Sequence, residues 1–206
     1  MPLPKKYLAL PSPAVPTINF ADLAEGITIF NAYSANNTAA EQYLMTTAVP
    51  YSNLISSSGS VGVGTSYELD FDSGILNRPM ILKGTCIANV TWKVTNSTGS
   101  NNNFPFAKLR KWNGTTETEI AEASGSIISS DAGAKVTSAI QIANIAATLI
   151  KSGEQIRMTI GVTGTTTGSS PKAHIAHDPQ NRNNVYFDSG NVDTTKMIFA
   201  IPSKIA

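Results

Sequence analysis

Two histidines stand first among the few residues of this chain that could do chemistry. His174 and His177 are separated by Ile175 and Ala176, and Asp178 follows directly. Side chains alternate between the two faces of a strand, so the imidazoles should point apart, which argues against a shared metal site. His177 and Asp178 could form the dyad of a small β-sandwich hydrolase. No serine or cysteine stands in a nucleophile motif such as Gly-x-Ser-x-Gly, so we predict no catalytic residue and no enzyme.

Closely spaced carboxylates are the second candidate. Asp70 and Asp72 share a strand face, and so do Glu117 and Glu119. Paired carboxylates catalyse glycoside hydrolysis, but we interpret the two glutamates as solvated strand positions. Residues 188–193 offer oxygen ligands for Ca²⁺, yet their spacing does not match an EF-hand loop and a turn is the preferred interpretation. The sequence predicts no metal and no cofactor.

Aromatic side chains could line a carbohydrate groove. The candidates are Trp112, Tyr51, Tyr67 and Tyr186. In a β-sandwich, scattered aromatic residues more often belong to the core or to an interface. Glycan binding therefore remains an alternative to a purely structural role.

The amino-acid composition limits the class of protein that carries these residues. Of 206 residues only 14% are charged, against roughly 25% in typical domains, and the net charge is +1. Such a balance recruits neither nucleic acid nor an anionic membrane. The single cysteine, Cys86, lies in an apolar run and is expected to be a buried thiol. The chain has no signal-peptide core and no apolar stretch of about 20 residues, so we expect a soluble protein made in a cytoplasm.

Short β-prone segments recur with turn signals between them. We expect strands at residues 26–33, 66–71, 80–95, 106–112, 117–123, 136–145, 155–162, 173–177, 185–187 and 195–201. Residues 39–45 are ambiguous between a helical turn and a strand, and the Ser/Gly-rich residues 56–64 are expected to form a loop. In the strand after residue 136, the apolar side should include Ala146. The pattern predicts an all-β fold with a single antiparallel β-sandwich, jelly-roll-like in strand number.

The N-terminal segment differs from the rest. Residues 1–17 contain five prolines, which favour an extended arm, and residues 18–206 are assigned to the sandwich domain. A terminal tail is the alternative. The apolar residues of the segment favour an arm that lies along a neighbouring subunit, and they are the interface candidates: Leu3, Tyr7, Leu8, Leu10 and Val15.

Two stretches together resemble a known group. Residues 18–30 (INFADLAEGITIF) resemble the opening of virion structural proteins of tailed bacterial and archaeal viruses. Residues 150–160 (IKSGEQIRMTI) and 176–182 (AHDPQNR) are similar to a pattern of the same loosely defined group. The resemblance implies a head- or tail-associated jelly roll and carries no catalytic residues. Within the last stretch, His177, Asp178 and Arg182 are interpreted as a loop staple or, alternatively, as a receptor contact.

The expected function is therefore that of a virion structural protein, most concretely a capsid-associated decoration or stabilising protein. Its partners would be the major capsid protein or other virion proteins and its own copies, with a trimer as the expected assembly, and it would be located in the virion. The alternatives are a tail, fibre or vertex module that binds host-surface glycans and, more remotely, the small hydrolase.

Overall fold

The computed structural model describes residues 25–37, 40–96, 101–130, 135–165, 170–182, 187 and 195–205. These residues form twelve strands and no helix, and thus no helix that could cross a membrane. In chain order the strands are β1 (Glu25–Asn37), β2 (Ala40–Thr46), β3 (Ser56–Ser60), β4 (Tyr67–Asp72), β5 (Met80–Thr95), β6 (Asn101–Trp112), β7 (Glu117–Ser124), β8 (Ile128–Ser130), β9 (Lys135–Ile150), β10 (Gln155–Gly164), β11 (Lys172–Ala176) and β12 (Ile198–Ile205).

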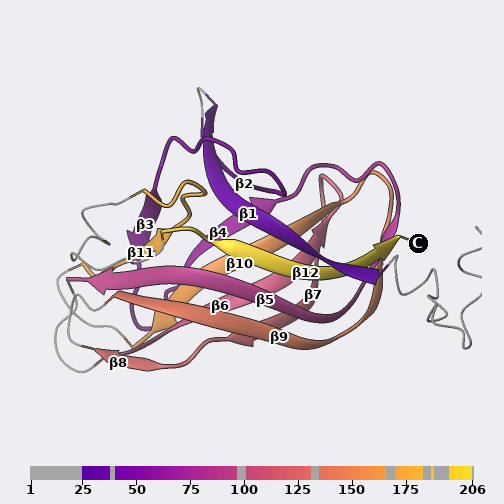
Figure 1. Ribbon diagram of the computed structural model, residues 1–206. Helices are drawn as coiled ribbons and strands as arrows, with labels where there is room; N and C mark the ends of the chain where they lie inside the picture. Colours follow the sequence, from indigo (N-terminus) through magenta and orange to yellow (C-terminus); the bar gives the residue numbers. More distant parts are fainter. Residues whose placement is uncertain are drawn as a thin grey trace, which may run out of the picture.

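Eight of the strands form two facing sheets (Figure 1). The first sheet runs β1-β12-β5-β9 and the second β4-β10-β6-β7, with antiparallel pairing within each. Numbered along the chain, these are strands one, eight, three and six against strands two, seven, four and five, which is the order of a jelly roll. The predicted all-β, jelly-roll-like sandwich is confirmed.

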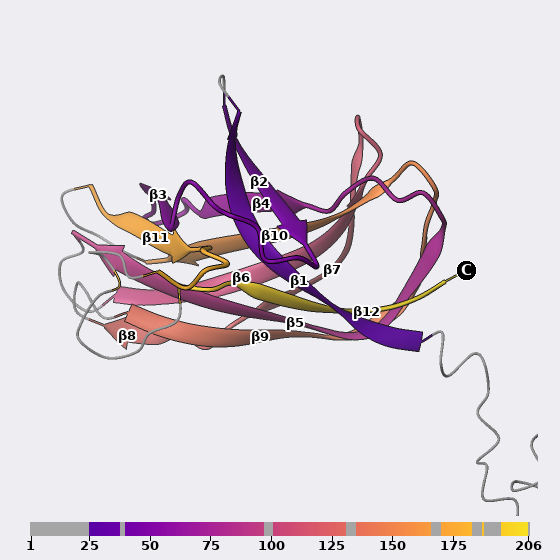
Figure 2. The ribbon, with the colours of Figure 1, turned by 45° about the horizontal axis from the view of Figure 1, so that its top comes forward.

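The remaining strands extend and join the two sheets. β11 pairs with the C-terminal end of β5 on the side that β12 occupies further along, β3 pairs with β11, and β8 pairs with β6 in the second sheet. The first half of β1 pairs with β12 and its second half with β2, which meets β4 at Leu44 and Asp72. In the view of Figure 2, β1 therefore leaves β12 and rises toward β2.

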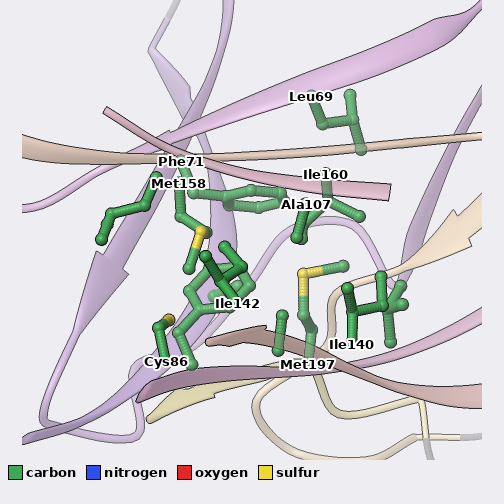
Figure 3. Packing of buried hydrophobic residues seen from close by; sticks show 14 of the residues in the cluster. Leu69, Phe71, Cys86, Ala107, Ile140, Ile142, Met158, Ile160 and Met197 are labelled. Carbon is green, nitrogen blue, oxygen red and sulfur yellow. The ribbon is translucent and has the colours of Figure 1, made fainter. Parts of the chain in front are cut away.

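The core lies between the two sheets. Figure 3 shows side chains of the second sheet facing those of the first: Leu69, Phe71, Ala107, Met158 and Ile160 opposite Cys86, Ile140, Ile142 and Met197. Strict alternation explains the inner face of β10, where Ile156, Met158, Ile160 and Val162 are all buried as predicted. Cys86 is also buried as predicted, and burial raises the pKa of its thiol to about 12.

The two ends of the sandwich differ. Short turns close one end, among them the predicted hairpin turn at Asn113, whose carboxamide oxygen accepts hydrogen bonds from the amides of Thr115 and Thr116. The turns before β5 and β10 pack together there, since Leu76 exchanges backbone hydrogen bonds with Glu154 and Gly153. The longer connections, from β1 to β4 and from β10 to β12, gather at the other end (Figure 1).

The expectation of a loop at residues 56–64 is wrong at its start, where β3 lies. β3 pairs with β11 in an unbroken register from Ser56 opposite Ala176 to Ser60 opposite Lys172. Gly59 allows the ring of Tyr67 to lie against the backbone, where any side chain would collide with it. Serine and glycine are poor strand formers, so the neighbouring strand and not local propensity makes this segment extended.

Ala146 is exposed, which corrects its assignment to the apolar side of β9. Between Leu82 and Cys86, β5 advances by four residues while its partner β9 advances by six, from Thr148 to Ile142. These bulges shift the alternation, so that Ile145 is buried in place of Ala146. Opposite the bulges Gly84 has a φ of 115°, and the register between β5 and β12 shifts nearby as well.

Several expected features lie outside the described residues. They are the arm at residues 1–17 with all five of its interface candidates, Val185 and Tyr186 of an expected strand, and the possible Ca²⁺ loop at residues 188–193. The ambiguous residues 39–45 lie mostly within β2 and are a strand where they are described.

Candidate functional site

The connection from β11 to β12 folds around Asp178. This residue is fully buried, and its carboxylate accepts hydrogen bonds from the backbone amides of Gln180 (3.2 Å) and Arg182 (2.6 Å). Its own amide donates to the carbonyl oxygen of Thr195 at 2.9 Å. Asp178 thus ties the start of the connection to its end.

Arg182 joins this connection to the one between β2 and β3. Its guanidinium forms two hydrogen bonds with the Asp178 carboxylate, through Nε at 3.0 Å and Nη2 at 3.1 Å. Nη2 also donates to the carbonyl oxygen of Ser52 at 2.6 Å, and the group lies 5.0 Å from the ring centre of Tyr51. A bidentate, charge-assisted pair of this kind fixes both distance and orientation.

Asn181 completes the loop junction. Its φ of 56° is left-handed, a conformation that asparagine tolerates better than most residues. Its carboxamide oxygen accepts hydrogen bonds from the amides of Thr195 at 2.7 Å and Lys196 at 3.3 Å. The structure therefore brings Asp178 and Arg182 into one braced junction, together with Asn181 and Thr195, which sequence reasoning missed, whereas the side chain of His177 makes its contacts elsewhere.

His177 lies beneath this junction, fully buried against Tyr43 and Phe71. Its Nε2 is 2.8 Å from the hydroxyl oxygen of Ser57, to which the hydroxyl of Tyr43 donates at 3.0 Å. Nδ1 has no hydrogen-bond partner in the described part of the chain. Burial lowers the pKa of His177 to about 4 and outweighs the attraction of the Asp178 charge, so the imidazole is neutral at neutral pH.

The Ser57–His177 contact resembles two members of a catalytic triad but lacks the third. In a triad an acid accepts the Nδ1 proton of the histidine and holds its orientation. Here the Asp178 carboxylate binds Arg182 and backbone amides, and Nδ1 faces no acid among the described residues. Ser57 is itself buried, and a histidine with a pKa near 4 is a weak base. The geometry suits a packed polar contact between β3 and the connection that follows β11.

His174 has separate surroundings. Its Nε2 lies 3.0 Å from the hydroxyl of Thr95, and its pKa is lowered by burial first and then by the charges of Lys93 and Lys172. The two histidines thus have different hydrogen-bond partners. In the residues that the structure describes, no three His, Cys, Asp or Glu side chains gather where they could hold a metal ion.

The predicted carboxylates meet on the outer face of the second sheet. Arg157 of β10 binds both oxygens of Asp72, at 2.7 and 2.8 Å, and donates to Glu117 at 2.8 Å. These hydrogen bonds, above all those that the guanidinium donates to Asp72, raise its pKa and keep it charged. Arg157 also lies over the ring of Trp112, 4.5 Å from its centre.

Arg110 of β6 extends this charged cluster. It is paired with Glu117 and lies 3.9 Å from Asp70 and 3.7 Å from Glu119. Glu117 is bound by two arginines, which corrects its interpretation as a solvated position. Neither Arg157 nor Arg110 was recognised from the sequence, because only the pairing of β10 with β4 and β6 places them between the carboxylates.

A polar groove of about 560 Å³ lies where β2 and β4 diverge. Its walls include Gln42, Tyr43, Glu68, Asp70 and Asp72. Of the aromatic residues expected at a carbohydrate site, Trp112 is covered by Arg157, Tyr51 contacts Arg182 and Tyr67 packs against Gly59. Tyr186 lies outside the described residues.

Part of the outer face of the first sheet carries exposed apolar side chains. Ile29 of β1, Ala200 of β12 and Ile87 of β5 form one row across three strands, and Ile27 lies opposite Pro202 in the next row. Ile27 is 65% exposed, Ile29 48%, Ile87 38% and Leu149 of β9 46%. These residues, with Ile81 and Pro202, are called the apolar face below.

An apolar groove of about 470 Å³ opens in this face beside the bulge at Gly84. Ile27, Ile81 and Pro202 line it, and Lys83 and Lys204 lie at its margin. Gly84, which has no side chain, also lines the groove, and the registers on both sides of β5 shift beside it. No acidic side chain is among the described residues that line the groove.

Fold and site together define a jelly-roll β-sandwich with braced loops and an apolar outer face. No protein family matches this sequence, and no curated protein is similar to it. Among solved structures, it is similar to an aminopeptidase from the marine sediment archaeon Thaumarchaeota archaeon, with 7% identity over 86% of this chain and 37% of the other, and a TM-score of 0.53. That similarity shows a shared fold.

Two looser similarities have TM-scores below 0.5. One is to a CocE/NonD family hydrolase from Staphylococcus aureus, with 12% identity over 84% of this chain and 36% of the other, at a TM-score of 0.47. The second is to a structure of infectious bursal disease virus, Gx strain, with 7% identity over 88% and 37% of the chains, at 0.31. The chain spans little more than a third of these proteins, and neither similarity bears on its function. The resemblance to virion proteins of tailed viruses stays a prediction.

Proposed function

We propose that this chain is a non-enzymatic structural protein of a viral particle, most concretely a capsid-associated decoration or stabilising protein. The observation that carries the proposal is the apolar face. Four large aliphatic side chains, between 38% and 65% exposed, lie on the outside of one sheet. Contiguous apolar surface on a folded domain marks an interaction site, and charged residues are depleted at the centre of protein interfaces.

The arrangement of the polar residues supports the same proposal. Asp178 and Arg182 bind each other and the neighbouring backbone, and the carboxylates of the charged cluster bind arginines. Groups held in this way stabilise loops and strands, which a particle component must keep in place. The partners would be the major capsid protein or other virion proteins, and the protein would be located in the virion. The apolar residues of the N-terminal segment, among them Leu8 and Leu10, would add to that contact.

The polar groove supports a second candidate function, a tail, fibre or vertex module that binds host-surface glycans. Carboxylates and carboxamides are the groups that hydrogen-bond sugar hydroxyls, and Gln42, Glu68 and Asp70 line one groove. Binding to a glycan array should then weaken when Gln42 is replaced by alanine. Gln141→Ala, which removes an exposed glutamine from the other sheet, is the matched control.

Quantitative mass spectrometry of purified particles tests the main proposal. Copies in simple proportion to the major shell protein are expected for a capsid role, whereas a few copies per particle would favour the tail or vertex module. Ile87→Lys should reduce incorporation, because it places a charge in the apolar face. Ile127→Lys, an exposed isoleucine in the loop after β7, should not. Absence of the protein from particles would overturn the proposal.

A further inference from the structure

Among the strands that the structure describes, the first half of β1 is an edge strand with a free side. Over Glu25–Asn31 it pairs with β12, whereas β2 pairs only with Asn31–Asn37. In the described part of the chain, no strand lies along the other side of residues 26–30, and no backbone hydrogen bond outside the sheet involves them. In Figure 2, this end of β1 lies beside β12 and away from β2.

Apart from its short length, this edge lacks the features by which proteins prevent strand pairing. Natural edge strands are protected by charged side chains, prolines, bulges or shortness. β7, the edge strand of the second sheet, carries Glu117, Glu119 and Glu122 within eight residues. Residues 26–31 of β1 are Gly-Ile-Thr-Ile-Phe-Asn, with neither a charge nor a proline, and their register with β12 is unbroken.

The edge is also complementary to itself. In an antiparallel pair centred on Thr28, Ile27 of each copy would lie opposite Ile29 of the partner subunit. Both side chains belong to the apolar face and are about half exposed or more, at 65% and 48%. Directly opposite β-branched side chains on one sheet face attract each other. A two-fold axis repeats the contact on both copies, as a closed dimer requires.

Charge does not oppose this pairing. Glu25, at the start of β1, would lie opposite Asn31 of the partner subunit, and the lysines that line the apolar groove, Lys83 and Lys204, belong to β5 and β12. In the paired sheet, the two β1 strands would separate these lysines from their equivalents in the other copy. The apolar faces of the two copies would then lie side by side on the same side of the joined sheet.

We propose that a second copy of this chain binds the free edge of β1, so that the two first sheets join into one continuous sheet. The inference rests on the proposed function, because it names a second copy of this chain as one partner of the apolar face. A two-fold pair replaces the trimer expected from the sequence. Five paired residues make a small interface, at the weak end of the range for specific contacts, so the dimer should form at micromolar concentration.

Sedimentation equilibrium of the full chain across the micromolar range tests the pairing. The wild type should shift from monomer to dimer, and Ile27→Lys and Ile29→Lys should weaken the dimer at least tenfold. Ile127→Lys is the matched control, because Ile127 is 63% exposed against 65% for Ile27. A wild type that stays monomeric, or a dimer that both β1 variants leave intact, overturns the inference.

Hydrogen exchange of the same samples tests the geometry. Amides between Gly26 and Phe30 should become protected as concentration rises, in step with the dimer. Protection without any dependence on concentration would assign the edge to another segment of the same chain and overturn the inference, as would a dimer with unprotected amides. These outcomes concern the edge alone, whereas the particle composition decides the proposed function independently.

Discussion

Arg182 binds the buried carboxylate of Asp178 through its backbone amide, at 2.6 Å, and through its guanidinium, at 3.0 and 3.1 Å. The same guanidinium donates to the carbonyl oxygen of Ser52, which belongs to the connection between β2 and β3. One arginine thus joins the two long connections at the open end of the sandwich. The position of these two connections relative to each other therefore depends on the Asp178–Arg182 charge pair and not on apolar packing alone.

Replacing Asp178 by asparagine should destabilise the protein by about 2–3 kcal/mol. Asparagine keeps the shape of the side chain but removes its charge, so that Arg182 loses its paired anion. One of the two oxygens that accept hydrogen bonds is also replaced by an NH₂ group, which donates. Urea unfolding measures the change. Glu119→Gln, at a carboxylate that is 45% exposed, should cost less than about 0.5 kcal/mol and is the control. Equal effects of the two substitutions would contradict the role given to Asp178.

Stability should fall as the pH is lowered from 6.5 toward 4, because of His177. Its pKa is depressed in the folded state to about 4, so between these values the unfolded chain binds a proton that the folded chain does not. The contribution is fully present above pH 6.5 and amounts to about 3 kcal/mol when integrated over the shift. Urea unfolding at several pH values measures it.

His177→Gln should flatten that pH dependence, and His174→Gln should leave most of it. The comparison separates His177 from carboxylates, which titrate near the lower end of the same range. If the slope of unfolding free energy against pH survives in His177→Gln, the buried imidazole is not its cause.

Gly84→Ala should destabilise the sandwich by about 1–2 kcal/mol. The φ of 115° is open to glycine and strained for any residue with a side chain. Gly26→Ala is the control, since nothing lies within 4 Å of the added methyl group and its φ is ordinary. Thermal unfolding of both variants checks the prediction, which fails if Gly84→Ala is as stable as Gly26→Ala.

Arg157→Lys should cost about 1–2 kcal/mol although it keeps the charge. Lysine cannot make the bidentate contact with Asp72 and reach Glu117 at once, and it loses the planar contact with Trp112. Lys108→Gln, which removes a loose pair with Glu68 at 3.7 Å, should cost less than about 0.5 kcal/mol. Denaturant unfolding followed by Trp fluorescence compares them, and equal losses would refute the specific role of the guanidinium.

Hydrophobic alternation predicted the strands whose inner faces are regular. β10 and the segment from Met197 to Ile201 follow period two, because each has one face in the core. The same rule failed at Ala146, where bulges opposite Gly84 change the face on which each residue lies. It also failed at β3, a serine-rich segment that is extended only because β11 pairs with it.

The contacts of the candidate site also divide into local ones, which the sequence could predict, and distant ones, which it could not. Asp178 and Arg182 are four residues apart in one turn, so their proximity could be expected from local sequence. The partners of the carboxylates could not, because Arg157 lies 85 positions from Asp72 and meets it only through strand order. The contact of His177 with Ser57 spans 120 positions and depends on the unforeseen β3.

The antiparallel pairing of the first and last described strands has a mechanical consequence. Glu25, at the start of β1, lies opposite Lys204, near the end of β12. The start of the first strand and the end of the last strand therefore lie side by side. A force that pulls these two points apart would break the hydrogen bonds between β1 and β12 one pair after another. It would not load all of them together in shear. A chain tethered through both ends should therefore yield at low tension by peeling β1 from β12, and tethering through one end alone would leave the sandwich unloaded.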